Sequence, residues 1–253
     1  MNLSLYENAA ALRGLQEYQD IIANNIAASH VAGFKAGAVG FEAVEAGEFA
    51  RSTHDRLKNE MPGSFPLVRS EIDYAEGELR QTNNDMDLAL HGDGFFALTS
   101  VNGDTTYTRD GQFYVNADGV LVNVMGYEFA NTGGSNIRVA EGGSPLTIDK
   151  EGQIFQDGVL VDQIGVFTFD DPNADLRKIG GGFQPRRPEA VPTEAEPGQY
   201  QIMQGFLESS NVSAIREMVN LIELTRAHEA NQKMIQAYDQ NIGRAIGTLG
   251  HTT

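Results

Sequence analysis

Two pairs of residues have side chains that could support catalysis. His228 and Glu229 resemble the start of a zinc-protease motif, but Gln232 occupies the position of its second histidine. Asp170 and Asp171 supply neighbouring carboxylates of the kind that cleave glycosides, but Trp is absent and no aromatic sugar platform is evident. We therefore predict no catalytic residues and no enzymatic activity.

Ligand and metal motifs are incomplete as well. A Gly-rich segment, Gly92-Asp93-Gly94, fits a dinucleotide loop formally, but such a loop opens a helix and the following residues 95–99 have a strand pattern. Three oxygen-bearing side chains alternate as in a calcium loop without its glycine and closing glutamate: Asn83, Asp85 and Asp87. The five histidines lack ligand spacing: His30, His54, His91, His228 and His251. We predict no cofactor and no metal site.

Charge and composition exclude further classes of function. The 253-residue chain has a net charge of −17 and scattered basic residues, which argues against nucleic-acid binding. It contains no Cys, so disulfides, thiolate metal sites and a cysteine nucleophile are excluded. No apolar stretch approaches the roughly 20 residues that span a bilayer, and polar residues interrupt the first stretch. We expect a soluble chain that, if exported, uses no cleaved Sec signal.

Both ends of the chain have the pattern of a helix with one apolar seam. The spacing is alternately three and four residues, as in a heptad repeat, and few helix breakers interrupt it. We expect Ser209 or Ser210 to cap the second helix. The first seam comprises Leu5, Asn8, Leu12, Leu15, Gln19, Ile22 and Ile26. The second comprises Leu221, Leu224, His228, Asn231, Ile235, Tyr238, Ile242, Ala245 and Leu249.

A second apolar row lies early in the C-terminal helix. Ile215, Met218, Val219 and Ile222 follow helical spacing, so this half is expected to touch more than one neighbour. Polar residues within the seams weaken an isolated coiled coil but specify register and partners: Asn8, Gln19, His228 and Asn231. The helices are therefore expected to order on joining other copies, although packing within a single globule stays open.

The middle of the chain has short strand patterns separated by glycine turns. Residues 112–116 and 120–122 flank Asp118-Gly119 and give the clearest hairpin, because Asp-Gly favours the positive φ angles of a tight turn. Strands are also expected at 95–99 and 105–108. No helical pattern interrupts them, so the predicted sheet is antiparallel. This middle holds 27 acids and 12 bases, which indicates a solvated acidic surface.

The predicted fold class is mixed α and β, with N- and C-terminal helices as a coiled-coil-like pair flanking an antiparallel, mainly β inserted domain. The predicted ranges are an N-terminal helix over 1–30, a transition segment over 31–76, a β-rich domain over 77–180, a Pro/Gly-rich return segment over 181–203 and a C-terminal helix over 204–253.

Several motifs in this order resemble the flagellar axial proteins of bacteria, the rod and hook components of the basal body. The resemblance covers nearly the whole chain and is carried by residues 23–27, 33–35, 77, 81–83, 87–96, 107–113, 118–122, 126–127, 204–212, 217–218, 226 and 229–233. His228 replaces a usual aromatic residue, and Ala28 replaces a usual Asn. Chain length and one compact β region resemble a rod protein, with proximal rod favoured over distal rod.

The resemblance implies a structural subunit that assembles through its terminal helices into a tube that transmits torque. It implies export through the flagellar type III apparatus, location in the periplasm-spanning basal-body rod, and partners that are other copies and other axial proteins. The predicted assembly interface comprises Leu5, Leu12, Leu15, Ile22, Asn24, Asn25, Ile26, Gly33, Phe34, Leu221, Leu224, His228, Asn231, Ile235, Tyr238, Ile242 and Leu249.

Two other classes of function stay open from the sequence. A free periplasmic or surface binding domain would use the acidic β region to hold a cation or a basic partner. A glycan-cleaving enzyme would use some of the many carboxylates.

Overall fold

The computed structural model describes residues 3–45, 64–100, 102–140, 144–196 and 198–250. Its contacts divide the chain into two compact units. We call them the helical unit, which comprises Met1–Ala27, Gly37–Glu71 and Ser213–Thr253, and the β unit, which comprises Ala28–Ala36 and Ile72–Val212. Both ends of the polypeptide therefore belong to the helical unit.

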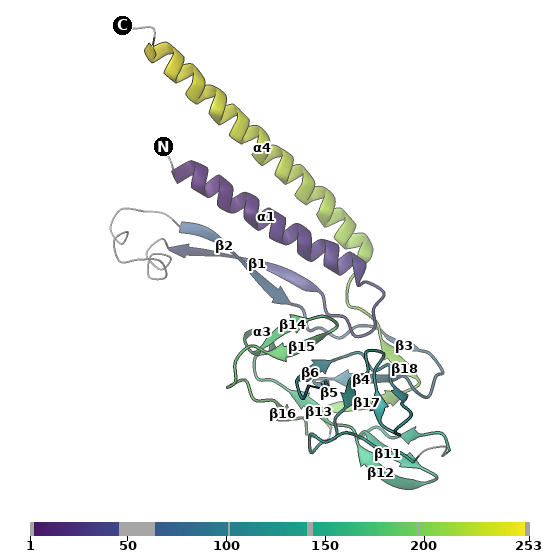
Figure 1. Cartoon of the computed structure of the whole chain (residues 1–253). Helices are drawn as coiled ribbons and strands as arrows, with labels where there is room; N and C mark the ends of the chain where they lie inside the picture. Colours follow the sequence, from purple (N-terminus) through teal and green to yellow (C-terminus); the bar gives the residue numbers. More distant parts are fainter. Residues whose placement is uncertain (1–2, 46–63, 101, 141–143, 197, 251–253) are drawn as a thin grey trace. The chain divides into compact units, whose positions relative to one another are not determined.

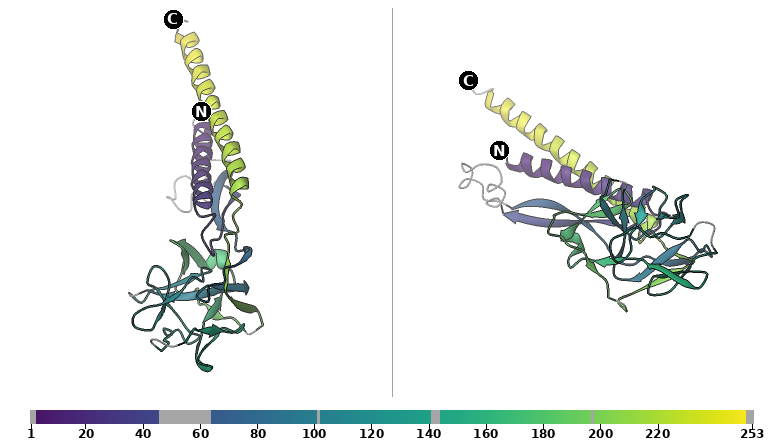
Figure 2. Two further views of the ribbon diagram at one scale, coloured as in Figure 1. Left: turned by 90° about the vertical axis from the view of Figure 1, so that its right-hand side faces the viewer. Right: turned by 60° about the horizontal axis from the view of Figure 1, so that its bottom comes forward.

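Two long helices and one strand pair make up the described part of the helical unit. Helix α1 (Leu3–Ala27) and helix α4 (Ala214–Gly250) lie side by side in all views (Figures 1 and 2). Strands β1 (Gly37–Glu45) and β2 (Ser64–Ile72) pair with each other within the segment predicted as a transition, of which residues 46–63 lie outside the described residues. Neither described helix is long and apolar enough to cross a membrane.

Helix α4 begins later than the sequence indicates. The amide of Glu217 donates to the carbonyl oxygen of Ser213 at 3.0 Å, which makes Ser213 the residue at the start of the helix. The predicted cap at Ser209 or Ser210 is wrong, because the Ser209 amide instead donates to the Glu78 carbonyl oxygen at 2.8 Å. The first residues of the range 204–253 therefore continue a sheet.

The β unit contains short strands and one short helix. Every pairing between its named strands is antiparallel, as predicted. The elements are β3 (Leu79–Gln81), β4 (Leu88–Gly92), β5 (Phe95–Thr99), β6 (Thr105–Thr108), β7 (Tyr114–Val115), β8 (Leu121–Val122), β9 (Glu128–Phe129), β10 (Thr147–Ile148), β11 (Gln153–Gln156), β12 (Val159–Gln163), β13 (Val166–Thr168), α3 (Pro172–Asp175), β14 (Leu176–Ile179), β15 (Gly182–Pro185), β16 (Thr193–Glu194), β17 (Tyr200–Gln204) and β18 (Phe206–Glu208).

The predicted hairpin at Asp118-Gly119 is confirmed. Tyr114 pairs with Val122 and Val115 with Leu121, and Gly119 has a φ of 73°, which glycine adopts without the steric cost of a side chain. The strands expected at 95–99 and 105–108 are β5 and β6, which pair with each other.

Strand β5 explains why the core of the β unit has two sides. Successive side chains of a strand point to opposite faces, so Phe95 and Ala97 join one apolar cluster while Phe96 and Leu98 join the other. Both faces are covered, which accounts for the continuous apolar sequence of this strand. In the smaller cluster Phe95 meets Phe183 edge to face, with ring centroids 5.5 Å apart.

Long-range pairing builds much of the β unit. Strand β17 pairs with β4 and β18 pairs with β3, each across more than a hundred residues of sequence. The range 181–203, predicted as a return segment, contains β15 and β16 and reaches into β17. The proline content of this range argued against strands, yet β15 pairs with its neighbour β14, while β17 pairs with the distant β4.

Candidate assembly surface

Helix α4 packs one of its faces inside the helical unit. Leu224 is buried on this face, with an exposed fraction of 6%. The other predicted seam residues whose side chains are described are half-buried on the same face: Leu221, His228, Asn231 and Ile235. The α4 seam is therefore the side of the helix that its own unit shields from solvent.

The opposite face of α4 is apolar but uncovered. Exposed fractions are 77% for Ile215, 50% for Met218, 50% for Val219 and 54% for Ile222, and we call these four residues the uncovered row. Because a helix turns about 100° per residue, Ile222 and Leu224 point about 200° apart. A contiguous exposed apolar stripe is typical of a surface that another protein covers. Nothing in the described part of the chain covers this row.

The seam of α1 is shielded over its last turns. Ile22 is fully buried, and three further predicted residues are half-buried: Leu12, Leu15 and Ile26. Gln19, predicted within the seam, is exposed, whereas Tyr18 is half-buried. Burial, and then the carboxylates of Glu217 and Glu223 on α4, raise the pKa of Tyr18. The side chains of Leu5, Asn8, Tyr238, Ile242, Ala245 and Leu249 lie outside the described residues.

Asn25 connects three segments of the helical unit. Its Nδ2 donates to the Gly37 carbonyl oxygen at 2.8 Å and to Glu217 Oε1 at 3.1 Å, and its Oδ1 accepts from the Gly37 amide at 2.8 Å. Only 2% of the residue is exposed, so the amide group is fully used inside the chain. Its neighbour Asn24 is exposed and is free to face another subunit.

Adjacent asparagines offer a matched test of this arrangement. We expect Asn25→Ala to lower the free energy of unfolding of the helical unit by about 1–3 kcal/mol, because it leaves both polar groups of Gly37 unsatisfied near the interior. Asn24→Ala is expected to change it by less than about 0.5 kcal/mol, as surface substitutions usually do. Urea unfolding followed by far-UV circular dichroism measures both values, and equal values would contradict the assignment.

Three ionised side chains form a buried cluster in the β unit. Lys35 Nζ lies 2.6 Å from Glu208 Oε1, and Arg109 Nη1 lies 3.3 Å from Glu208 Oε2. Lys35 also donates to the Ala75 carbonyl oxygen at 2.8 Å. All three residues are 5% exposed or less. Burial lowers the pKa of Lys35, and the adjacent Glu208 carboxylate opposes that shift.

Two residues of the predicted interface belong to the β unit. A Cβ atom added to Gly33 would lie 2.3 Å from the Arg109 carbonyl carbon, and Gly33 has a φ of 65°. Gly33 therefore permits a close backbone approach within the chain and is buried there, and its contact with another subunit stays a prediction. Phe34 is half-buried, and Lys178 Nζ lies 3.3 Å from its ring centroid.

The pH dependence of stability tests the environment of Lys178. Burial lowers the pKa of Lys178 from 10.5 to about 8, while its Nζ donates to the Lys35 carbonyl oxygen at 2.7 Å. Between these pKa values the unfolded chain holds more protons than the folded β unit, so the free energy of unfolding rises with pH and this gain is lost as the pH falls through about 8. We expect Lys178→Met to flatten that rise in urea titrations.

Comparing the pH slope of the free energy of unfolding in the native chain and in Lys178→Met separates the contribution of Lys178 from those of other groups. Lys35 also has a lowered pKa and contributes a rise of the same sign to both proteins. A variant with an unchanged slope would contradict the buried position of the amine.

The residues suited to chemistry have structural roles. Asp171 caps α3 by accepting from the amides of Asn173 and Ala174, both at 3.1 Å. The segment 92–94 leads into strand β5 rather than a helix. Among the described residues, no three His, Asp or Glu side chains are grouped to hold a metal ion.

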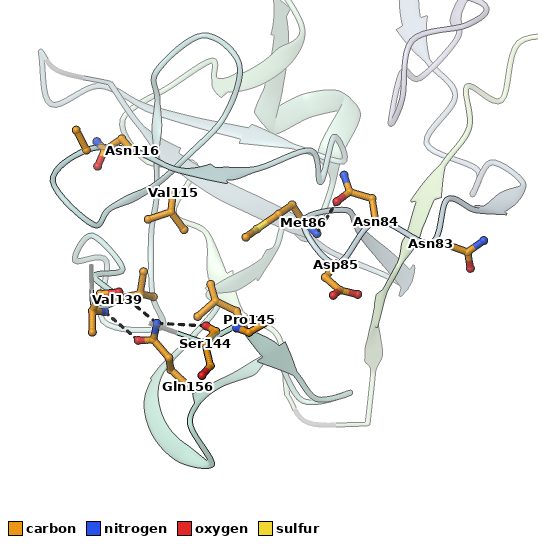
Figure 3. Close-up of a pocket in the computed structure, with 13 residues that line it drawn as sticks. Asn83, Asn84, Asp85, Met86, Val115, Asn116, Val139, Ser144, Pro145 and Gln156 are labelled. Atoms are coloured by element: carbon orange, nitrogen blue, oxygen red, sulfur yellow. Dashed lines mark hydrogen bonds between the residues drawn. The ribbon is translucent and has the colours of Figure 1, made fainter. Parts of the chain in front are cut away.

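One surface cavity, of about 790 Å³, lies in the β unit (Figure 3). Polar groups that line the cavity form hydrogen bonds with each other. Gln156 Oε1 accepts from the Ala140 amide at 2.9 Å, and Asn84 Oδ1 accepts from the Met86 amide at 3.2 Å. Among the described lining residues only Asp85 is ionisable. This cavity therefore offers no acid–base pair for catalysis.

Comparison with known proteins finds two matching family models. The model described as the C-terminal region of flagellar basal body rod FlgEFG proteins matches residues 203–248. The model described as the D1 domain of flagellar hook protein FlgE/F/G matches residues 89–156. The first covers α4 and the strands before it, and the second covers strands of the β unit.

Curated relatives match over almost the full length of the chain. Flagellar basal-body rod protein FlgF of Mesorhizobium japonicum is 33% identical and covers 99% of each chain. The FlgF protein of Caulobacter vibrioides is 31% identical, again over 99% of each chain. Flagellar basal-body rod protein FlgG of Bacillus subtilis is 30% identical over 94% of this chain and 95% of its own.

Proposed function

The chain belongs to the flagellar basal-body rod protein family and is a structural subunit of the basal-body rod, and from this premise we propose that it joins its neighbours through the uncovered row of α4. The exposure of this row is the observation that carries the proposal. The helical unit shields only the seam face of α4 from solvent. The apolar side chains on the opposite face would therefore be buried by another subunit.

Assembly through α4 combines a covered and an uncovered face in one helix. Inside the chain, Leu224 and Ile22 hold the helical unit together, and outside it the uncovered row supplies the contact. Each such contact is modest, so the stiffness of a rod comes from its repetition over many copies. We propose that these repeated contacts transmit torque and that α1 and α4 form a coiled-coil-like pair in the assembly.

The remaining seam residues are proposed as secondary contacts. Asn24 is exposed on α1, and Asn231 and His228 are half-buried polar residues on α4 that suit a register-specific contact. Among the residues predicted from the sequence, we also retain Leu5, Tyr238, Ile242 and Leu249 as proposed contacts towards the helix ends.

The family indicates the kind of partner, and we propose an export route that is consistent with it. Assembly with other rod and hook axial proteins is implied by the named relatives, as is a non-enzymatic role. We propose that the chain leaves the cytoplasm through the flagellar type III apparatus and assembles in the periplasm. Helices with single seams are marginal in isolation, which suits passage through a narrow channel. A proximal position in the rod is proposed over a distal one.

A deletion tests the role of α4. In cells that lack the native gene, an epitope-tagged full chain is expected to restore motility and to place immunogold label on the rod of purified basal bodies. The same chain without residues 221–249 is expected to be made but to be absent from basal bodies and to leave cells non-motile. Motility with the shortened chain would contradict the proposal.

A further inference from the structure

The chain passes between the helical unit and the β unit four times. The passages lie at 27/28, 36/37, 71/72 and 212/213. A force that travels along the polypeptide from one unit to the other passes through these connections. Each connection ends at a residue within each unit. The contacts that a unit makes with these end residues therefore decide whether one connection or several carry a load.

One side chain joins three of these ends within the β unit. Asn211 Oδ1 accepts from the Ala36 amide at 2.7 Å, and Asn211 Nδ2 donates to the carbonyl oxygens of Asp73 at 2.8 Å and Ala75 at 3.1 Å. Ala36, Asp73 and Asn211 each lie within two residues of a different passage. All donors and acceptors of this amide group are used.

Further bonds tie the same segments to each other. The Asp73 amide donates to the Ala36 carbonyl oxygen at 2.8 Å, and the Gly33 amide donates to the Glu208 carbonyl oxygen at 2.8 Å. Arg109 Nη2 donates to the Gly92 carbonyl oxygen at 2.7 Å, which anchors the buried Lys35–Glu208 pair to the strands of the core. Hydrogen bonds thus join the segments around Ala36, Asp73 and Asn211 to each other within the β unit.

These contacts differ in kind from those of Asn123, another asparagine of the β unit. Asn123 Oδ1 accepts from the amides of Met125 and Tyr127, both at 2.9 Å, and so stabilises a turn of its own sequence neighbours. Asn211 instead reaches residues 136 to 175 positions away. A local turn does not need such bonds, whereas a link between chain passages does.

We propose that Asn211 is a load-sharing clamp, which holds the ends of three connections together so that force on one connection is carried by all three. A single strand end under load separates one hydrogen bond at a time, whereas ends tied through one amide must separate together. The benefit of such a clamp rests on the torque-bearing role proposed above, but its mechanical effect is a property of the single chain.

Single-molecule pulling on the purified full-length chain tests this clamp. The absence of native Cys allows two handles to be attached at introduced cysteines. One pair, Asp118→Cys with Glu229→Cys, loads the connections between the units. The other pair, Asp118→Cys with Asp170→Cys, loads the β unit without passing through a connection. Asn211→Ala is compared with Asn123→Ala, which removes local bonds in the same unit.

The two pulling geometries separate a clamp from an ordinary structural residue. Loss of three hydrogen bonds in Asn211→Ala is expected to raise the rate of unfolding under load by about tenfold through the connections and by less than about twofold within the β unit. Asn211→Asp keeps the acceptor for Ala36 but sets a carboxylate oxygen against the carbonyl oxygens of Asp73 and Ala75, so it is expected to unfold at least as fast as Asn211→Ala through the connections. Equal acceleration in both geometries would overturn the clamp, and that result would leave the rod function untouched.

Discussion

Glu208→Gln is expected to lower the free energy of unfolding of the β unit by about 3–5 kcal/mol, the usual cost of removing one partner from a buried ion pair. The carboxylate is the counter-ion of both Lys35 and Arg109, and its side chain is 0% exposed. Neutralising it leaves two cations without water or a counter-ion. Arg109 Nε already has no partner among the described residues, so no spare acceptor replaces the lost charge.

A neighbouring carboxylate supplies the control for this experiment. Glu78 is exposed in the strand segment that pairs with β18, and Glu78→Gln is expected to change the free energy of unfolding by less than about 0.5 kcal/mol. Chemical unfolding followed by tyrosine fluorescence reports mainly on the β unit, which holds five of the eight tyrosines: Tyr74, Tyr107, Tyr114, Tyr127 and Tyr200. Similar losses for the two variants would show that Glu208 is not the buried counter-ion described above.

The second large effect concerns assembly rather than folding. We expect Val219→Asp combined with Ile222→Asp to leave the isolated chain folded, because both side chains are at least half exposed, and to abolish incorporation into basal bodies and motility. Burying two carboxylates in a contact between subunits costs several kcal/mol per contact unless they are paired. The measurement combines circular dichroism of the purified chain with motility and electron microscopy of basal bodies.

A conservative variant separates loss of apolar contact from loss of a particular side chain. Val219→Ile combined with Ile222→Val keeps the row apolar and nearly unchanged in volume, and is expected to retain motility. Motile cells carrying the double Asp variant would show that the row remains in solvent in the rod.

Local patterns predicted the elements whose partners are close in sequence. Strand β5 has a continuous apolar run and its partner β6 follows after a short turn, so both were predictable. The second apolar row of α4 was also visible from spacing alone, because helical periodicity shows which residues share a face. The structure adds that the row is the uncovered face.

Features that depend on distant residues were not predictable from those patterns. The strand β18 precedes α4 and pairs with β3 far upstream, so its residues were included in the helical segment. Lys35, Arg109 and Glu208 occur within the motifs that resemble rod proteins, but nothing in their local sequence indicates that they meet. Likewise, nothing in the sequence around Gly33 indicates that it approaches the Arg109 backbone closely.

The helix seams illustrate a smaller limit. A three-four spacing fits either Tyr18 or Gln19 nearly equally well, and only the structure shows that Tyr18 is half-buried while Gln19 is exposed. Asn24 and Asn25 are identical in type, so the sequence does not show which of them is buried. Only the bonds to Gly37 and Glu217 identify Asn25 as the buried one.

Photo-crosslinking from Ile222 tests the central claim most directly. A photoreactive phenylalanine analogue replaces Ile222 in an otherwise native chain, and Ala227, exposed on the flank of α4, serves as the comparison position. After irradiation of intact basal bodies, the probe at Ile222 is expected to give adducts with another copy or another axial protein, and more of them than the probe at Ala227. Basal bodies that contain the labelled chain but yield no adduct from position 222 would contradict assembly through the uncovered row.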